Sequence, residues 1–335
     1  MNSHHQQPAV RATGLVKNFG DQRAVDGVDL EVQRGEVFGV LGPNGAGKTT
    51  MLKMLATLLP IDGGTGQVFG HDVSAEPHLV RQLIGVTGQF ASVDENLTAT
   101  ENLWLFARLQ GLGRTEARQR GAHLLEQFDL TEAASKPISA FSGGMRRRLD
   151  LAASLITRPP LIFLDEPTTG LDPRTRGQMW DTIRELVAEG STVLLTTQYL
   201  DEADQLADRI AVIDHGRKVA EGTADELKTS VGRSTLQLQL VDASDLPTAT
   251  ALAEQLLGEE PTVTPEARRM TVALQRTDQS VDLLVALRDR GVAIESVTVQ
   301  KPSLDEVFLA LTGHDTGADA ADQDDNQPTH MEASR

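Results

Sequence analysis

Apolar and polar residues alternate in the first part of the chain in a pattern that is typical of β-strands. Val28, Leu30 and Val32 are separated by charged or amide side chains, a period of two that places the apolar groups on one face. An apolar run over residues 36–41 then leads into a glycine-rich turn, and we expect it to be a buried strand. Apolar residues return at helical spacing over residues 49–59, which predicts a helix after the turn.

The middle of the chain is predicted to be mostly helical over about residues 90–158. Beyond it, the pattern predicts strands at residues 161–164 and 192–196 and helices at residues 175–189 and 200–207. Strands that alternate with helices are typical of a largely parallel sheet covered on both faces, so we expect an α/β fold.

A domain boundary is predicted near residues 229–234, because the pattern changes there to a small α+β arrangement. We expect residues 9–229 to form one domain and residues 234–313 to form a second, smaller one. Residues 1–8 and the acidic tail, residues 314–335, carry few large apolar side chains. They cannot bury enough surface to offset the entropy of ordering, so we expect a flexible N-terminus and a disordered tail.

The chain has 335 residues, no cysteine and a net charge of −17 at pH 7. An acidic chain is a poor match to general nucleic-acid binding, which needs clustered positive charge against phosphates. The lack of cysteine excludes disulfides, thiolate-ligated zinc and thiol catalysis. No run approaches the about 20 apolar residues that span a bilayer, and the N-terminus lacks the apolar segment of a signal peptide. We expect a cytosolic protein that reaches a membrane only through a partner.

The first chemical motif is Gly42-Pro-Asn-Gly-Ala-Gly-Lys48-Thr49, which matches the phosphate-binding loop G-x-x-x-x-G-K-[ST]. Its glycines let backbone N–H groups approach phosphate oxygens without a Cβ in the way. Lys48 adds a positive charge for the β- and γ-phosphates, and the Thr49 hydroxyl can bind Mg²⁺. The predicted strand before the loop and the helix after it are the context that such a loop requires.

A second polar motif follows the apolar run at residues 161–164. Asp165 and Glu166 stand where that strand ends, at the edge where open α/β sheets bind ligands. The pair alone is also compatible with a strand that enters a solvated loop, but the phosphate loop favours the functional interpretation. Asp165 is then positioned to hold Mg²⁺, and Glu166 to polarise a water for attack on the γ-phosphate.

A third motif, Ser142-Gly143-Gly144, opens a predicted helix that ends just before this strand. Ser142 can cap the helix, and the two glycines leave backbone N–H groups accessible, so the segment can form a second anion site. In isolation it is more simply a capped helix start. Its position directly before the strand that carries Asp165 favours the interpretation as an anion site.

Together these motifs resemble those of the ATP-binding subunits of ABC transporters over about residues 9–228. The resemblance rests on the phosphate loop, Gln89 in Val-Thr-Gly-Gln-Phe, Phe-Ser-Gly-Gly-Met at 141–145, Leu-Ile-Phe-Leu-Asp-Glu at 161–166 and Gly-Leu-Asp at 170–172. Thr-Thr-Gln-Tyr-Leu at 196–200 and Leu-Asp-Glu-Val-Phe-Leu-Ala-Leu-Thr-Gly at 304–313 look more narrowly like the daunorubicin/doxorubicin-resistance group. The resemblance implies a P-loop NTPase of ABC type, with a mostly parallel sheet, antiparallel β and helical subdomains, and a small C-terminal α+β domain.

The resemblance also implies roles for individual residues. The catalytic residues would be Glu166, Gln198 and Lys48. The Mg²⁺ ligands would be Thr49, Gln89 and Asp165. The residues that contact ATP would be Phe19, Gly42, Pro43, Asn44, Gly45, Ala46, Gly47, Lys48, Thr49, Thr50, Gln89, Ser142, Gly143, Gly144 and Asp172. In that family Phe19 would stack on adenine. Ser142 and Gly144 would contact the γ-phosphate of the ATP that an opposed second copy holds, and Asp172 would line the same interface.

The partners implied by the resemblance are ATP, Mg²⁺, a second copy of the chain and a separately encoded integral membrane permease, with no nucleic acid. The implied function is ATP hydrolysis that powers the export of a hydrophobic compound, such as an anthracycline antibiotic. The chain would act as a peripheral subunit on the cytoplasmic side of the cell membrane.

Three positions depart from the usual pattern of the family. Phe141 and Met145 flank Ser-Gly-Gly where Leu and Gln are favoured, a change that leaves the anion donors in place. Gln198 stands where most members carry His; its amide can donate a hydrogen bond but has no titratable proton. We therefore expect slow but real ATP hydrolysis, with little pH dependence arising from this position. The arginines at 146–148 are expected to form a solvated helix face near bound phosphate.

Two other functional classes fit less well. A soluble ABC ATPase of chromosomes or of translation is the main alternative. Chromosome-associated members insert long coiled coils between the motifs, whereas only 94 positions separate Lys48 from Ser142 here, and translation-associated members carry two ATP-binding halves. A phosphate-loop kinase or GTPase has no use for the Ser-Gly-Gly and Gly-Leu-Asp segments.

Overall fold

A computed structural model describes residues 7–88, 93–231, 234–276 and 278–313 of the chain. The chain folds into two compact units, the first ending at Ala224 and the second beginning at Asp225. The described residues do not include residues 1–6, Gln89 or residues 314–335. The predictions that concern these residues therefore also lie outside the described part of the chain. Pro8, at the end of the segment predicted to be flexible, is buried two residues before the first strand, which begins at Val10.

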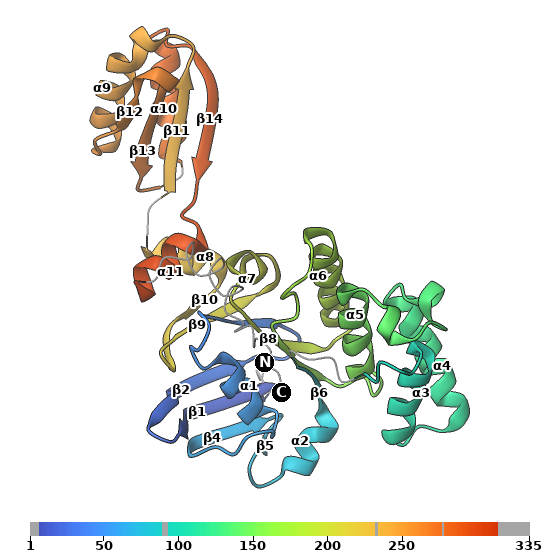
Figure 1. The fold of residues 1–335 in the computed structure, drawn as a ribbon. Coiled ribbons are helices and arrows are strands. Elements are labelled where there is room, and N and C mark those ends of the chain that lie inside the picture. Colours follow the sequence, from blue (N-terminus) through green and yellow to red (C-terminus); the bar gives the residue numbers. More distant parts are fainter. Residues whose placement is uncertain (1–6, 89–92, 232–233, 277, 314–335) are drawn as a thin grey trace, which may run out of the picture. The chain divides into compact units, whose positions relative to one another are not determined.

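The strands of the first unit form two sheets (Figure 1). An antiparallel sheet, in the order β2-β1-β4-β5, consists of β1 (Val10–Phe19), β2 (Gln22–Val32), β4 (Gly63–Val68) and β5 (His71–Asp72). A larger sheet, in the order β10-β9-β3-β8-β7-β6, consists of β3 (Val37–Leu41), β6 (Ile84–Thr87), β7 (Leu161–Asp165), β8 (Thr192–Thr197), β9 (Arg209–Asp214) and β10 (Arg217–Gly222). The larger sheet is parallel except for its edge strand β10, so the predicted fold class is confirmed.

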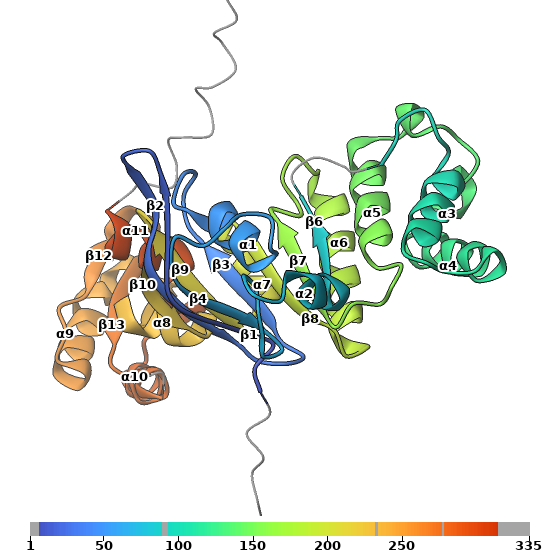
Figure 2. The same ribbon diagram turned by 90° about the horizontal axis from the view of Figure 1, so that it is seen from below.

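The helices of the first unit are α1 (Lys48–Leu55), α2 (Pro77–Leu83), α3 (Ala99–Leu109), α4 (Arg114–Gln127), α5 (Gly143–Ser154), α6 (Pro173–Ala188) and α7 (Leu200–Leu206). Helices α3, α4 and α5 gather at one end of the unit (Figure 2). The helix predicted over residues 49–59 ends earlier, at Leu55, because Thr57 takes a left-handed conformation with a φ of 62°. Among the described residues, no helix combines the length and the apolar character that crossing a bilayer requires.

The central strands of the larger sheet are buried on both faces. In β7, Leu161 and Phe163 pack into a core with α1 and the antiparallel sheet. Ile162 and Leu164 point the other way, into a core formed with the helices α3–α6. A strand covered on both sides needs apolar residues at every position, which explains the unbroken apolar run in the sequence.

The second unit is a small α+β sandwich. Its strands, in the sheet order β12-β13-β11-β14, are β11 (Ser234–Leu240), β12 (Thr262–Thr264), β13 (Arg269–Leu274) and β14 (Ile294–Gln300). Its helices are α8 (Ala224–Val231), α9 (Leu246–Leu257), α10 (Gln279–Asp289) and α11 (Leu304–Thr312). The chain order of strands and of the helices α9 and α10 is that of the ferredoxin-like split βαβ arrangement. Leucines of β11 pack against leucines of α9 and α10 to form its core.

Helix α11 begins as its sequence predicts. The Ser303 hydroxyl oxygen accepts a hydrogen bond from the backbone N–H of Glu306 at 3.2 Å, which caps the helix. Leu304, Val307 and Phe308 are buried, and Gly313 ends the helix in a left-handed conformation.

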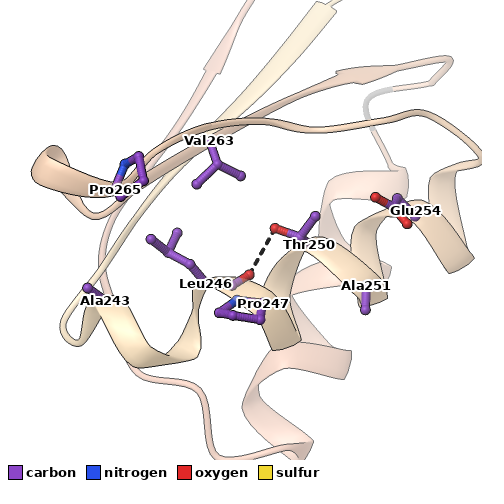
Figure 3. A pocket seen from close by; sticks show the side chains of 8 residues that line it. All are labelled: Ala243, Leu246, Pro247, Thr250, Ala251, Glu254, Val263 and Pro265. Carbon is purple, nitrogen blue, oxygen red and sulfur yellow. Dashed lines mark hydrogen bonds between the residues drawn. The ribbon is translucent and has the colours of Figure 1, made fainter.

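A groove of about 510 Å³ lies between α9 and β12 in this unit (Figure 3). Leu246 and Val263 face each other across it. The Thr250 hydroxyl donates to the Leu246 carbonyl at 2.9 Å, and Glu254 is the one ionisable residue of the lining. The groove therefore presents mainly apolar surface.

Candidate nucleotide-binding site

The phosphate loop joins β3 to α1, and two of its glycines are fixed by close neighbours. A Cβ on Gly42 would lie 2.2 Å from the Ile213 carbonyl oxygen, and one on Gly47 would lie 2.3 Å from the Ala24 carbonyl oxygen. Gly47 also has a φ of 103°, which only glycine adopts readily. The loop thus depends on these glycines for its packing as well as for the approach of a phosphate.

The other loop residues named from the sequence lie between β3 and the first turn of α1. Asn44 and Gly45 are exposed at the tip of the loop, where Gly45 has a φ of 81°. Ala46 is buried, and its N–H donates to the Pro43 carbonyl at 3.2 Å. Thr50 lies half-buried in the first turn of α1.

Lys48 is buried inside the loop, with 4% of its surface exposed. Its ammonium group donates to the carbonyl oxygens of Gly42 at 2.8 Å and Pro43 at 3.0 Å. The Glu166 carboxylate lies 3.6 Å away. Burial lowers the pKa of Lys48, while the charges of Glu166 and Asp165 oppose that shift. The amine therefore lies between the loop and the two acids at the end of β7, Asp165 and Glu166.

Asp165 joins three elements through one carboxylate oxygen. Its Oδ1 accepts from the Thr49 hydroxyl of α1 at 2.8 Å and from the Thr196 hydroxyl of β8 at 2.6 Å. Neighbouring ligands of an octahedral Mg²⁺ lie about 3 Å apart, and the ion prefers oxygen ligands. The Thr49 and Asp165 oxygens fit that spacing and chemistry. Thr196 was not predicted as a site residue; its signal in the sequence is a hydroxyl at the end of a buried strand.

Glu166 adopts a backbone conformation that is rare for a residue with a side chain. Its φ is 49°, in the left-handed region, which costs about 1–2 kcal/mol for an L-residue. Its N–H donates to the carbonyl and hydroxyl oxygens of Thr196, both at 3.1 Å, and the Thr169 hydroxyl donates to its carboxylate at 3.3 Å. Strain of this kind persists where the surroundings fix the backbone, and it is common at active sites.

The Ser-Gly-Gly segment is the start of α5, as predicted. Ser142 caps the helix by accepting from the Met145 N–H at 3.3 Å. Ser142 and Gly143 are exposed, so the start of α5 is accessible to a ligand. A Cβ on Gly144 would lie 2.6 Å from a carbon of the Thr175 side chain, so α5 approaches α6 closely at this point.

Asp172 caps α6 in a similar way. Its carboxylate accepts from the N–H groups of Arg174 at 3.1 Å and Thr175 at 3.0 Å, and from the Thr175 hydroxyl at 2.6 Å. The hydrogen bonds from Thr175 lower the pKa of Asp172. Within the described part of the chain, the hydrogen bonds of Ser142 and Asp172 join their own helix starts and not the phosphate loop. The structure therefore brings together Lys48, Thr49, Asp165 and Glu166, but neither of these two.

Of three further predicted residues, two lie at the ends of strands and one lies outside the described residues. Phe19 ends β1; the residue is 49% exposed, and the Lys17 amine lies 5.7 Å from its ring centroid. Gln198 directly follows β8 and is half-buried. Gln89 lies outside the described residues; Gly88, just before it, follows the end of β6.

The arginines of α5 do not form the solvated face that was predicted. Arg146 pairs with the Glu95 carboxylate at 2.8 Å, and Arg148 donates to the Phe128 carbonyl at 3.0 Å. The Arg147 guanidinium is surrounded by backbone carbonyls. Helical spacing predicts which face of a helix a residue occupies, but not which distant carbonyls meet that face.

Helix α7 contains a buried acid that was not predicted from the sequence. Glu202 is fully buried, and its Oε1 accepts from the Thr168 hydroxyl at 2.8 Å and from the Trp180 ring N–H at 3.3 Å. Burial raises the pKa of Glu202 above its ordinary value of 4.5. The acid thus links the segment after Glu166 to the helix after Gln198.

Comparison with known proteins agrees with this geometry. A family described as "ABC transporter" matches residues 25–169, and one described as "ATP-binding protein DrrA1-3-like, C-terminal domain" matches residues 222–312. The chain is 55% identical to the daunorubicin/doxorubicin resistance ATP-binding protein DrrA of Streptomyces peucetius, over 91% of this chain and 93% of that protein. It is 41% identical to the Nod factor export ATP-binding protein I of Ralstonia nicotianae, over 92% and 95% of the two chains.

A solved structure of a dimeric ATP-binding cassette, in a post-hydrolysis state with ADP and Pi, is also similar. Its TM-score is 0.59 at 26% identity, over 64% of this chain and 98% of that one. The resemblance inferred from the motifs is therefore confirmed, and with it ATP binding and ATP hydrolysis. This chain belongs to the ATP-binding proteins of ABC transporters, within the daunorubicin/doxorubicin resistance group.

Proposed function

We propose that the chain hydrolyses ATP to power the export of a hydrophobic compound, such as an anthracycline antibiotic, through a separately encoded membrane permease. The observation that carries the catalytic part is the single cluster of Lys48, Thr49, Asp165 and Glu166. The export part is supported by relatives that are named for drug resistance and for Nod factor export. In this proposal, residues 9–229 bind the nucleotide, and residues 234–313 form a separate C-terminal domain.

ATP would bind by replacing contacts that the loop now makes with itself. The Lys48 amine, held by the Gly42 and Pro43 carbonyls, would turn to the β- and γ-phosphates. Backbone N–H groups of the loop and of the first turn of α1 would donate to phosphate oxygens, favoured by the positive end of the helix dipole. The exposed Phe19 ring would stack on the adenine.

Hydrolysis would depend on the groups at the ends of β7 and β8. Thr49 and Asp165 would hold Mg²⁺, together with Gln89, and the ion would neutralise charge on the β- and γ-phosphates. Glu166 would accept a hydrogen bond from the attacking water and orient it. Gln198 would donate its amide N–H to the γ-phosphate, in the role that His plays in most relatives.

The second half of each site would come from another copy of the chain. Ser142 and Gly143 are exposed residues at a helix start, Gly144 next to them is half-buried, and Asp172 caps the neighbouring helix. These groups make their hydrogen bonds away from the loop of their own chain, which supports a role toward the ATP of an opposed copy. ATP would draw two copies together, and hydrolysis would release them.

The permease would hold the pair of subunits at the cytoplasmic side of the cell membrane. Affinity purification of the tagged chain from membranes of its native host tests this partner. We expect a polytopic membrane protein to co-purify, both with the unaltered chain and with Glu166→Gln. Recovery of ribosomes or DNA in its place would support the alternative, a soluble ABC ATPase that is not coupled to transport.

Transport itself is tested in inside-out vesicles that contain the chain and the co-purified permease. Fluorescence of daunorubicin should report uptake into the vesicles with ATP. Glu166→Gln is the matched control, because it should assemble and bind ATP without turnover. Uptake that is equal in the two preparations would contradict ATP-driven export.

A further inference from the structure

Arg147, in the second turn of α5, donates to four backbone carbonyl groups. Its Nε donates to Pro167 at 3.1 Å, and its Nη2 donates to Asp165 at 2.7 Å and Glu166 at 2.9 Å. Its Nη1 donates to Gly88 at 2.5 Å. One half-buried guanidinium thus joins the end of β7 to the end of β6.

The three consecutive carbonyls at 165–167 reach the same guanidinium because the chain turns at Glu166. In an extended strand, successive carbonyl groups point to opposite sides. The left-handed conformation of Glu166, with a φ of 49°, breaks that alternation. Hydrogen bonds from a charged donor are about twice as strong as neutral ones, so Arg147 stabilises this strained turn.

The turn fixes the direction in which the Glu166 carboxylate points. That carboxylate lies 3.6 Å from the Lys48 amine, and the Glu166 N–H is held on the other side by Thr196. Within the described residues, none of the hydrogen bonds of Arg147 goes to the phosphate loop that would bind ATP. It acts on the backbone of the acid and on the residue that precedes Gln89.

We propose that Arg147 is a positioning residue for ATP hydrolysis, which holds Glu166 in its left-handed turn so that the carboxylate meets the attacking water. The proposal rests on the proposed role of Glu166. Arg147 is not a catalytic residue, because it touches backbone carbonyls and not the reacting groups. The neighbouring Arg148 serves a different purpose: it donates to the Phe128 carbonyl at the end of α4.

Steady-state kinetics of Arg147→Met and Arg147→Lys test the proposal on the full chain. A displacement of about 1 Å in a catalytic group costs roughly 100-fold in rate, so we expect kcat of Arg147→Met to fall by about that factor. KM for ATP should change by less than about threefold, because Arg147 does not hold the nucleotide. Arg147→Lys keeps the charge but reaches fewer carbonyls, so its kcat should lie between that of Arg147→Met and that of the unaltered chain.

The matched control is Arg148→Lys, the same exchange at the next position of the same helix. Its kcat should stay within about twofold of the unaltered chain. Two results would overturn the proposal: a kcat of Arg147→Met within about threefold of the unaltered value, or an equal loss in Arg147→Lys and Arg148→Lys.

A double-mutant cycle separates this inference from the proposed function. Single-turnover hydrolysis of radiolabelled ATP is measured for Glu166→Gln with and without Arg147→Met. If Arg147 acts through Glu166, the two residual rates agree within about threefold. If Arg147→Met lowers the residual rate by the same factor as in the unaltered chain, the positioning role is wrong. Full activity of Glu166→Gln would instead contradict the proposed function itself.

Discussion

The ammonium group of Lys48 and the carboxylate of Glu166 lie 3.6 Å apart, and both side chains are buried. Lys48 comes from the phosphate loop and Glu166 follows β7, so this ion pair closes the site across the parallel sheet. A γ-phosphate that enters the site would replace Glu166 as the ionic partner of Lys48. The Glu166 carboxylate, whose direction the turn fixes, would then accept a hydrogen bond from a water molecule. The pair therefore suits a site that orders its catalytic groups before ATP binds.

The first prediction concerns Lys48. We expect Lys48→Ala to weaken the binding of ATP by about 100-fold or more, because removal of one partner from a buried charge contact costs about 2–5 kcal/mol. Isothermal titration calorimetry with Mg-ATP measures the Kd directly.

Lys53→Ala is the matched control, since Lys53 lies exposed on the same helix. Its Kd should equal that of the unaltered chain. A Kd for Lys48→Ala within about threefold of the unaltered value would show that the loop lysine does not hold the phosphates.

The second prediction concerns Gln198 and pH. Loss of a positioned donor to developing charge costs about 10²–10³ in rate, and Gln198 retains one donor, so hydrolysis should be slow but measurable. Because an amide does not titrate, kcat should show no limb at about pH 6–7 that depends on this residue. Steady-state rates of the unaltered chain and of Gln198→Ala are compared across this range.

Gln198→His gives the complementary result. An imidazole there should introduce a limb at about pH 6–7 that the unaltered chain lacks. If the unaltered chain already shows such a limb and Gln198→Ala abolishes it, the account of this position is wrong.

The third prediction concerns the buried acid Glu202. Burial raises its folded-state pKa above 4.5, so the folded state binds the proton more tightly than the unfolded state does. Its contribution to stability is complete below about pH 4.5 and is lost as the pH rises through the folded-state pKa. Glu202→Gln keeps an acceptor for Thr168 but cannot ionise. Its Tm should therefore exceed that of the unaltered chain by more at about pH 8 than at about pH 5.

Differential scanning calorimetry at the two pH values checks this difference. Glu185→Gln, an exposed change on α6, is the control, and its Tm difference should be the same at both pH values. A Tm difference for Glu202→Gln that is larger at about pH 5 would contradict the direction of the pKa shift.

The sequence predicts the central strands β3, β7 and β8 of the larger sheet and the groups that gather in the site, because their signals are local. The strands β4, β5, β6, β9 and β10 were not predicted. The phosphate loop is one continuous segment, and Asp165 and Glu166 directly follow an apolar run that marks a buried strand. The parallel sheet then brings the ends of β3 and β7 to the same edge. This reasoning needs only the order of strands and helices along the chain.

The parts that the sequence does not predict depend on partners far away in the chain. Thr196 reaches Asp165 because β8 pairs with β7. Arg147 donates to the backbone carbonyl groups of residues 88 and 165–167. Every residue has a backbone carbonyl group, so these partners leave no signal in the sequence. Glu202 looks like an ordinary acid of a helix until Thr168 and Trp180 enclose it. Local patterns identify chemical groups, whereas the contacts that orient those groups are set by the tertiary fold.

The central claim is that one ATP is held between the phosphate loop of one copy and the Ser142 helix start of another. Sedimentation velocity of Glu166→Gln with and without Mg-ATP tests it most directly, because this variant should bind ATP without hydrolysing it. We expect a monomer without nucleotide and a dimer with ATP, and a return to monomer when Ser142→Arg blocks the helix start. A chain that binds ATP fully and still sediments as a monomer would contradict the account.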